Sequence, residues 1–166
     1  MNGISVSVQM IYRELKPGEY ELLKYFTYEA IFIPEGVEPP EFSIIELPEL
    51  SLYYDAFGSR EDDYCMAAED EGVVVGAAWT RVMDDYGHVD DRTPSLAISV
   101  LKEYRGKGIG TRLLQALLES LKSKGYERVS IAVQKENYAV RMYEHAGFRT
   151  ISENEEEYIM VCDLNE

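Results

Sequence analysis

The chain has 166 residues, of which 46% are hydrophobic and 11% aromatic. This length and composition predict one domain with its own core and exclude an intrinsically disordered chain. The formal net charge of -15 is unevenly spread: residues 29–91 hold 17 acidic and two basic residues, whereas residues 101–150 hold ten basic and five acidic ones. We therefore expect no nucleic-acid partner.

Membrane, secretory and metal-binding signals are not visible in the sequence. No apolar run approaches the roughly 20 residues that span a bilayer, and the first residues lack the pattern of a signal peptide. Cys65 and Cys162 form neither a disulfide framework nor a metal-ligand spacing, and each is expected to be a small buried hydrophobe. We expect a cytoplasmic protein with no membrane partner and no bound metal.

The first half of the chain predicts a mainly antiparallel arrangement. Pro17 suits the first turn of a helix, Gly58 suits the end of a second one, and Gly72 suits a hairpin turn. The expected elements are a strand at 7–15, a helix at 17–32, a short helix at 47–58, and a hairpin of strands at 63–70 and 73–83.

The second half predicts alternating strands and helices. The expected elements are a strand at 95–101, a helix at 111–124, a strand at 128–133, a helix at 136–147 and two strands within 148–164. Such alternation predicts the α/β (α+β) class.

A glycine-rich, basic turn, "YRGKGIG" at residues 104–110, precedes the first helix of this half. Helix N-termini present free N–H groups and a partial positive charge, and glycines let a phosphate come close to them. The turn matches neither the Walker A loop nor the dinucleotide fingerprint in spacing. A turn that only packs helix against strand is the alternative, but two flanking cations favour a pyrophosphate site.

Two motifs in this half resemble those of the GCN5-related N-acetyltransferase (GNAT) superfamily. Residues 105–110, "RGKGIG", resemble its Arg/Gln-x-x-Gly-x-Gly/Ala signature. Residues 136–148, "ENYAVRMYEHAGF", resemble its Asn-x-Ala-x-x-Leu-Tyr-x-x-x-Gly-Phe segment. The resemblance covers roughly residues 94–164, and the first ninety residues agree only in element order.

The resemblance implies a GNAT fold, with a mixed, mainly antiparallel sheet of six to seven strands, about four helices, and a splay at the strand before the glycine turn. Residues 1–166 would form a single acetyltransferase domain, with an acceptor-side half at 1–92 and an acetyl-CoA half at 93–166. Acetyl-CoA would be the co-substrate, and a homodimer is possible. The residues implied in binding it are Ile98, Ser99, Val100, Arg105, Gly106, Lys107, Gly108, Ile109, Gly110, Thr111, Asn137 and Tyr143.

The reaction implied is direct attack of a primary amine on acetyl-CoA in a ternary complex. Tyr143 would protonate the departing thiolate, and the backbone N–H of Val100 would stabilise the oxyanion. The alternative role for Tyr143 is that of an ordinary buried tyrosine on the apolar face of its helix.

The general base stays open. The positions that carry a glutamate in two branches of the family fall at about Ala132 and near Pro94, and neither residue can take a proton. A water chain is one alternative. The remaining candidate bases are His88, Asp90, Asp91, Glu29 and Glu35.

The acceptor is expected to be a small-molecule or peptide amine, and a cationic one, because the first half is acidic and rich in aromatic residues. The residues expected to bind it are Glu29, Glu35, Tyr86, His88 and Asp91. A solvated acidic surface is the alternative. Two further readings of the whole chain are a coenzyme A-binding sensor or interaction domain without catalysis, and an α/β domain with a fortuitous turn.

Overall fold

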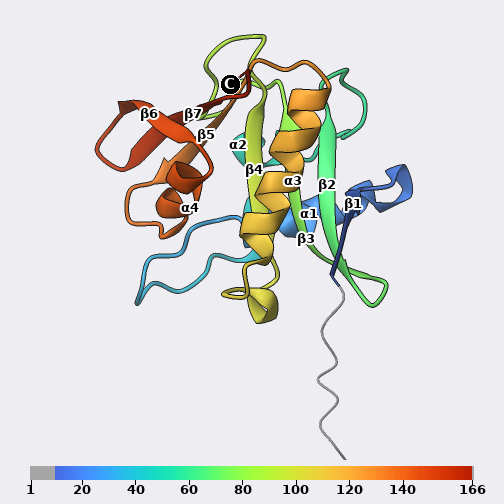
Figure 1. Ribbon diagram of the computed structural model, residues 1–166. Coiled ribbons are helices and arrows are strands. Elements are labelled where there is room, and N and C mark those ends of the chain that lie inside the picture. Colours follow the sequence, from blue (N-terminus) through green and yellow to red (C-terminus); the bar gives the residue numbers. More distant parts are fainter. Residues whose placement is uncertain (1–9, 166) are drawn as a thin grey trace, which may run out of the picture.

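The computed structural model describes residues 10–165, so residues 7–9 of the first expected strand lie outside the described part. Its centre is a seven-stranded sheet in the order β1-β2-β3-β4-β5-β7-β6 (Figure 1). All neighbouring strands are antiparallel except β4 and β5, which confirms the predicted sheet. The strands are β1 (Met10–Glu14), β2 (Tyr64–Asp70), β3 (Val73–Arg81), β4 (Ser95–Val100), β5 (Arg128–Gln134), β6 (Phe148–Glu153) and β7 (Glu157–Asp163).

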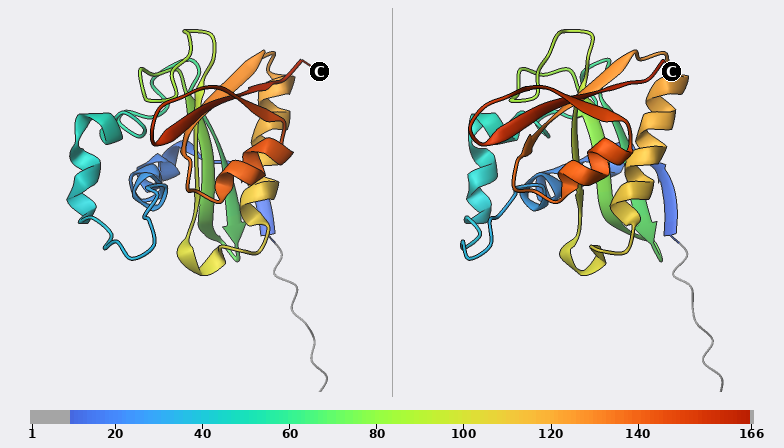
Figure 2. Two further views of the ribbon diagram at one scale, coloured as in Figure 1. Left: turned by 90° about the vertical axis from the view of Figure 1, so that its left-hand side faces the viewer. Right: turned by 60° about the vertical axis from the view of Figure 1, so that its left-hand side comes forward.

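Helices cover both faces of the sheet (Figure 2). One face carries α1 (Leu23–Glu29) and α2 (Pro48–Ser51), and the other carries α3 (Ile109–Ser123) and α4 (Ala139–His145). These four α-helices of the described residues agree with the predicted number. Three 3-10 helices complete the set: η1 (Pro17–Leu22), η2 (Phe42–Glu46) and η3 (Lys102–Tyr104).

The two helices expected in the first half are shorter than their sequence patterns suggest. The expected helix at 17–32 begins as the 3-10 turn η1 and ends at Glu29. The expected helix at 47–58 is helical only in α2, and turns follow it. There the buried Arg81 guanidinium donates hydrogen bonds to the carbonyls of Leu52 (3.0 Å) and Asp55 (2.7 Å). In a continued helix these carbonyls would accept hydrogen bonds from N–H groups of the same helix. Their bonds to the distant Arg81 therefore favour turns over a helix.

Two hydrophobic cores lie on opposite faces of the sheet. Successive strand residues point to opposite faces, so Ala78 and Leu96 contribute to the core under α3, whereas Trp79 and Ala97 contribute to the core under α1. Cys65 and Cys162 are both buried, as expected.

The sheet opens between β4 and β5. These parallel strands pair only at Ser95 and Ser130, where the Ser130 N–H also bonds the Pro94 carbonyl at 3.0 Å. Beyond this point they separate toward the glycine turn, at the lower end of α3 in Figure 1. The predicted splay is therefore confirmed, and it leaves one edge of β4 unpaired.

Candidate active site

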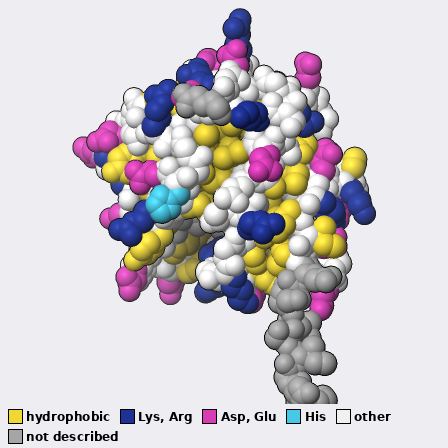
Figure 3. Space-filling view, viewed as in Figure 1, with side chains coloured by type: hydrophobic (Ala, Val, Ile, Leu, Met, Phe, Trp, Pro, Cys, Tyr) yellow, Lys and Arg dark blue, Asp and Glu magenta, His cyan; other side chains and the backbone are white. Residues whose placement is uncertain are grey.

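A cleft of about 750 Å³ occupies the gap between β4 and β5. Its walls come from both faces of the sheet, with Val100 and Tyr143 from the α3 side and Tyr53 and Trp79 from the α1 side. The cleft is therefore lined from both faces of the sheet. Figure 3 shows the α3 face, where hydrophobic side chains lie in a hollow surrounded by charged ones.

Most sequence-predicted site residues are brought together in this cleft. Those that line it are Glu29, Tyr86, Ile98, Ser99, Val100, Arg105, Gly106, Gly110, Asn137 and Tyr143. Those that do not line it are Glu35, His88, Asp91, Lys107, Gly108, Ile109 and Thr111.

The open edge of β4 presents backbone groups to the cleft. The Leu101 N–H bonds the Val75 carbonyl of β3 at 2.8 Å, and backbone groups of successive strand residues point to opposite sides. The N–H and C=O of Val100 and Ile98 therefore point away from β3, toward β5. Because β5 pairs with β4 only at Ser95, the N–H groups of these two residues are free of sheet partners and can bond an extended arm with amide groups.

Ser99 is oriented differently from its two neighbours. Its backbone faces β3, opposite Ala77, and its hydroxyl donates to the Phe26 carbonyl at 2.7 Å. The arrangement ties the end of α1 to β4. It gives Ser99 a structural contact and leaves the backbone bonds to a cofactor to Ile98 and Val100.

The glycine turn forms an anion cradle at the start of α3. Gly106 and Gly108 have φ angles of +76° and +81°, which L-residues rarely adopt. A Cβ on either glycine would meet nothing within 4 Å, so a ligand can approach this backbone. No side chain caps the helix, and its first N–H groups lack intrahelical acceptors. These features fit a pyrophosphate, the group that coenzyme A would bring there.

The two cations of the turn are placed differently. The Nε of Arg105 donates to the Val100 carbonyl at 2.8 Å, and its NH2 group reaches the carbonyl and carboxylate of Glu29, each at 3.1 Å. The Nζ of Lys107 lies 5.5 Å from the centre of the Tyr104 ring. Arg105 thus joins the turn to β4 and α1, while Lys107 extends along its exposed side.

Asn137 holds the start of α4. Its Oδ1 accepts the N–H of Ala139 at 2.9 Å and its own carbonyl accepts that of Val140 at 3.2 Å, which is the bonding of an N-terminal cap. Its side-chain amide group belongs to the lining of the cleft. The residue therefore positions the helix that carries Tyr143 and still offers donors to a ligand.

Tyr143 lies on the inner side of α4, with 4% of its surface exposed. Its ring packs on Phe148 at a centroid distance of 5.5 Å. Burial raises the pKa of Tyr143, so the phenol keeps its proton at neutral pH. Within residues 10–165 the Tyr143 hydroxyl has no hydrogen-bond partner. A protonated hydroxyl in a cleft can act as an acid.

Aromatic residues line the α1 side of the cleft, and not all of them are predicted site residues. Tyr53 and Trp79 line it together with Tyr86, and the Trp79 indole N–H donates to the Tyr53 carbonyl at 2.9 Å. Tyr53 is one of the aromatic residues of the first half, but nothing in its local sequence signals that it meets β3. Only the packing of residues 52–57 around Arg81 brings it there.

Among residues 10–165, two carboxylates line the cleft, Glu29 and Glu157. Glu29 is paired with Arg105. Glu157 begins β7 opposite Gln134 and is not among the predicted site residues. Many other acidic residues of the first half have structural partners, such as Asp63, which pairs with the buried Arg81 at 2.9 Å.

Three residues that were expected to bind the acceptor amine lie outside the cleft. His88 and Asp91 face each other at 3.6 Å on the loop between β3 and β4, and Glu35 is exposed on the loop after α1. The Asp90 carboxylate bonds Arg128 at 2.6 Å. These groups do not reach the cleft, so the structure gives no support to their roles in acceptor binding or as the base.

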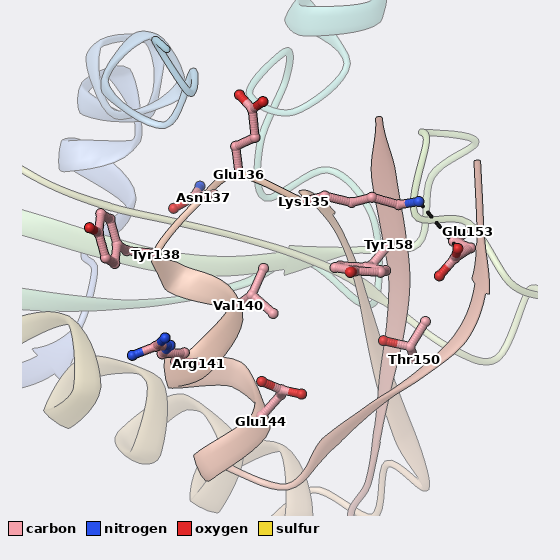
Figure 4. A pocket seen from close by; sticks show the side chains of 10 residues that line it. All are labelled: Lys135, Glu136, Asn137, Tyr138, Val140, Arg141, Glu144, Thr150, Glu153 and Tyr158. Carbon is pink, nitrogen blue, oxygen red and sulfur yellow. Dashed lines mark hydrogen bonds and ion pairs between the residues drawn. The ribbon is translucent and has the colours of Figure 1, made fainter. Parts of the chain in front are cut away.

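A second cavity of about 440 Å³ lies on the outer side of α4. Val140 and Tyr158 face each other across it, and Lys135 bonds Glu153 at 3.2 Å beside the Tyr158 ring (Figure 4). Asn137 is the only sequence-predicted site residue that lines it. The cleft at the splay is therefore the candidate site.

Residues 10–165 contain neither a candidate membrane-spanning helix nor a candidate metal site. No helix there is long and apolar enough to cross a membrane. No group of three or more His, Cys, Asp or Glu side chains in that range could hold a metal ion.

Residues 27–148 match the family model of the acetyltransferase (GNAT) family, so the chain belongs to this family. It is 34% identical over 143 residues to the mycothiol acetyltransferase of Propionibacterium freudenreichii, covering 72% of this chain and 45% of that protein. It is 31% identical over 139 residues to an N-alpha-acetyltransferase of Saccharolobus solfataricus, covering 72% of this chain and 82% of that protein. The chain thus spans less than half of the first relative and most of the second.

The fold is also that of solved structures. The PaiA N-acetyltransferase of Thermoplasma acidophilum, solved with coenzyme A, superposes with a TM-score of 0.68 at 19% identity, covering 93% of this chain and 99% of that chain. The predicted superfamily and fold are confirmed, and the predicted enzyme class is that of the relatives' names.

Proposed function

We propose that this chain is an acetyl-CoA-dependent N-acetyltransferase that transfers the acetyl group to a primary amine by direct attack in a ternary complex. The observation that carries the proposal is the open edge of β4, which joins three features in one cleft. These are free backbone N–H groups at Ile98 and Val100, an anion cradle at the glycine turn, and a protonated phenol at Tyr143.

The proposed roles follow from these positions. Acetyl-CoA supplies an acetyl thioester. The N–H groups of residues 106–111, with Lys107, would hold its pyrophosphate, and Ile98 and Val100 would bond its pantetheine arm. Val100 N–H would stabilise the oxyanion, and Tyr143 would protonate the sulfur that leaves.

The two faces of the sheet would serve the two substrates. The acetyl-CoA side belongs to residues 93–166 and the acceptor side mainly to residues 1–92, with Glu157 as an addition from β7. The relatives' names include acceptors of both peptide and small-molecule type. A cationic amine fits the aromatic wall of Tyr53, Trp79 and Tyr86 beside Glu157.

The test is a screen for coenzyme A thiol released from acetyl-CoA. The amines are spermidine, L-lysine, kanamycin and a tetrapeptide with a free α-amine and two lysines, and coenzyme A binding is measured alongside by calorimetry. Thiol release with one of them supports the proposal. Tight coenzyme A binding without any release would instead favour a non-catalytic sensor or interaction domain, and no binding would remove both.

A further inference from the structure

A carboxylate behind the acceptor wall accepts hydrogen bonds from two hydroxyl groups. Asp85 Oδ2 accepts from the Tyr53 phenol at 2.7 Å, and Asp85 Oδ1 accepts from Ser95 Oγ at 2.6 Å. Of these three residues only Tyr53 lines the cleft. The carboxylate is therefore joined to the wall of the cleft through Tyr53.

Both ends of this network are fixed to the sheet at the splay. The Tyr53 carbonyl accepts the Trp79 indole N–H at 2.9 Å. The loop that carries Asp85 is held by Ser130 Oγ, which donates to the Gly87 carbonyl at 2.7 Å. Gly87 packs so closely on β5 that a Cβ there would lie 2.9 Å from the Ala132 N atom. The hydroxyl and the carboxylate thus have little freedom to separate.

The Tyr53 phenol is a neutral hydrogen-bond acceptor toward the cleft. Burial, followed by the negative charge of Asp85, raises the pKa of Tyr53, so its proton stays in place at neutral pH. Because that proton is donated to Asp85, the lone pairs of the phenol oxygen are left for another donor. An amine N–H inside the cleft is such a donor.

We propose that Tyr53 and Asp85 form a proton relay that removes the proton from the acceptor nitrogen; this inference rests on the proposed function. An ammonium form of the acceptor first gives one proton to solvent, and the lone pair of the resulting neutral nitrogen forms the bond to the acetyl carbon. The nitrogen's N–H bond breaks as an O–H bond forms on Tyr53, while the original Tyr53 O–H bond breaks and an O–H bond forms on Asp85 Oδ2. The carbon–sulfur bond breaks and the sulfur takes the Tyr143 proton. Asp85 then loses its proton to solvent, and Tyr143 regains one.

Tyr53 is the catalytic residue of the relay because it touches the acceptor. Asp85 acts through Tyr53, and Ser95 orients Asp85, so both are positioning residues. The other titratable groups that face Tyr53 are Glu157 from β7 and Tyr86 from the Asp85 loop. A carboxylate that contacts the amine directly stabilises its charged form. Glu157 would therefore hold the acceptor, and the relay would take its proton.

The variants that test the relay are Tyr53→Phe and Asp85→Asn, with Asp84→Asn as a matched control, because Asp84 is an exposed carboxylate one residue away. Asparagine keeps an acceptor for the Tyr53 proton but does not take it up. With spermidine and the lysine tetrapeptide as probes, kcat should fall about 10²-fold or more in both relay variants and stay unchanged in Asp84→Asn.

Two further measurements separate the relay from a merely structural role. A plot of kcat against the fraction of D2O should be curved in the wild type, because the relay moves two protons in addition to that of Tyr143, and should be less curved in Asp85→Asn. Calorimetry should show wild-type affinity of both relay variants for coenzyme A, and wild-type affinity of the Asp85→Asn coenzyme A complex for spermidine. In Glu157→Gln, by contrast, spermidine binding should weaken while kcat changes little.

The contrary outcomes are distinct. A kcat within twofold of wild type in folded Asp85→Asn or Tyr53→Phe would overturn the relay and leave the acetyltransferase in place. The dependence of kcat on pH separates Glu157 from Asp85. If Glu157→Gln lowers kcat and removes its decrease at low pH, while Asp85→Asn keeps both the wild-type kcat and that decrease, then Glu157 is the base. A wild type that binds coenzyme A but releases thiol with no amine of the panel would overturn the proposed function, and with it the relay.

Discussion

Arg105, at the glycine turn, bonds Glu29, the last residue of α1, through both the carboxylate and the carbonyl at 3.1 Å. The pair joins the two sides of the cleft at the point where the unpaired edge of β4 ends. A residue expected to bind the pyrophosphate and one expected to bind the acceptor are thus each other's partners.

Glu29→Gln should raise the affinity for coenzyme A up to about fivefold, the equivalent of the ~1 kcal/mol that an exposed ion pair is worth. The reason is that the freed Arg105 charge becomes available to phosphates. Calorimetric titration at low salt measures it, with Glu35→Gln as the control because Glu35 is exposed away from the cleft. If Glu29→Gln leaves the coenzyme A affinity unchanged and raises the KM for the acceptor, then Glu29 binds the acceptor.

Gly110→Glu should abolish coenzyme A binding and leave the chain folded. A Cβ at Gly110 would lie 3.7 Å from Met142 Sδ and 3.9 Å from Val100 Cγ2, which are ordinary contacts, and the carboxylate would enter the phosphate region. Gly110→Gln is the neutral control and should weaken binding less. Equal losses in both variants would mean that shape, and not charge, excludes the ligand.

The same charge at Gly108 is a poorer test, because the substitution also disturbs the fold. The φ of +81° at Gly108 costs an L-residue about 1–2 kcal/mol. A lowered Tm is therefore expected in Gly108→Ala as well, independent of any ligand. Thermal unfolding of the two alanine variants should show Gly108→Ala to be the less stable protein and Gly110→Ala to be near wild type.

Tyr143→Phe should lower kcat about 10²- to 10⁴-fold, because it removes the proposed acid and keeps the ring against Phe148. Burial raises the pKa of Tyr143, so the phenol should stay protonated near neutral pH. The wild-type enzyme should therefore not lose activity there through deprotonation of Tyr143. Coenzyme A affinity is expected to be unchanged and serves as the folding control. Wild-type turnover with chemistry limiting would leave Tyr143 as a core residue only.

Asp63→Asn should destabilise the fold by about 3–5 kcal/mol, because it leaves the buried Arg81 guanidinium without its partner charge. For this size of protein Tm should fall on the order of 10 °C. Burial by itself would raise the pKa of Asp63, but Arg81 and the N–H groups of Arg60 and Gly58 outweigh it and lower that pKa.

The sign of the pH dependence follows from that lowered pKa. Above the unfolded pKa of about 3.9 the Asp63 contribution to stability is fully present, and it is lost as the pH falls through the lower folded value. Denaturant titrations from pH 6 to pH 3 should therefore show a smaller loss of stability in Asp63→Asn than in the wild type. Parallel curves would mean that Asp63 does not titrate in this window.

The sequence predicts the second half of the molecule well because its signals are local. Glycines before a helix are read from neighbouring positions, and the glycine turn does precede α3 as expected. The acceptor side depends on contacts between distant residues. Glu157 enters the cleft only through the pairing of β7 with β5 opposite Gln134, and Tyr53 meets Asp85 across 32 positions. No local pattern carries such information.

The last prediction concerns the charge of the acceptor. If the acceptor is cationic, as the acidic first half suggests, its KM should rise with ionic strength as the Debye length falls from about 10 Å to 3 Å. The rise should be modest, because only Glu29 and Glu157 line the cleft and Glu29 is neutralised by Arg105. Initial rates with spermidine from 0.1 M to 1 M salt measure it.

Glu157→Gln identifies the source of that attraction. In this variant the KM for spermidine should rise severalfold at 0.1 M salt and respond less to added salt, since the one unpaired carboxylate of the cleft walls is gone. Glu49→Gln, a change on the exposed surface of α2, should keep the wild-type salt response. A salt response that survives Glu157→Gln and disappears in Glu49→Gln would place the attraction on the acidic surface. A wild-type KM indifferent to salt, or a preference for neutral amines in the screen, would exclude a cationic acceptor.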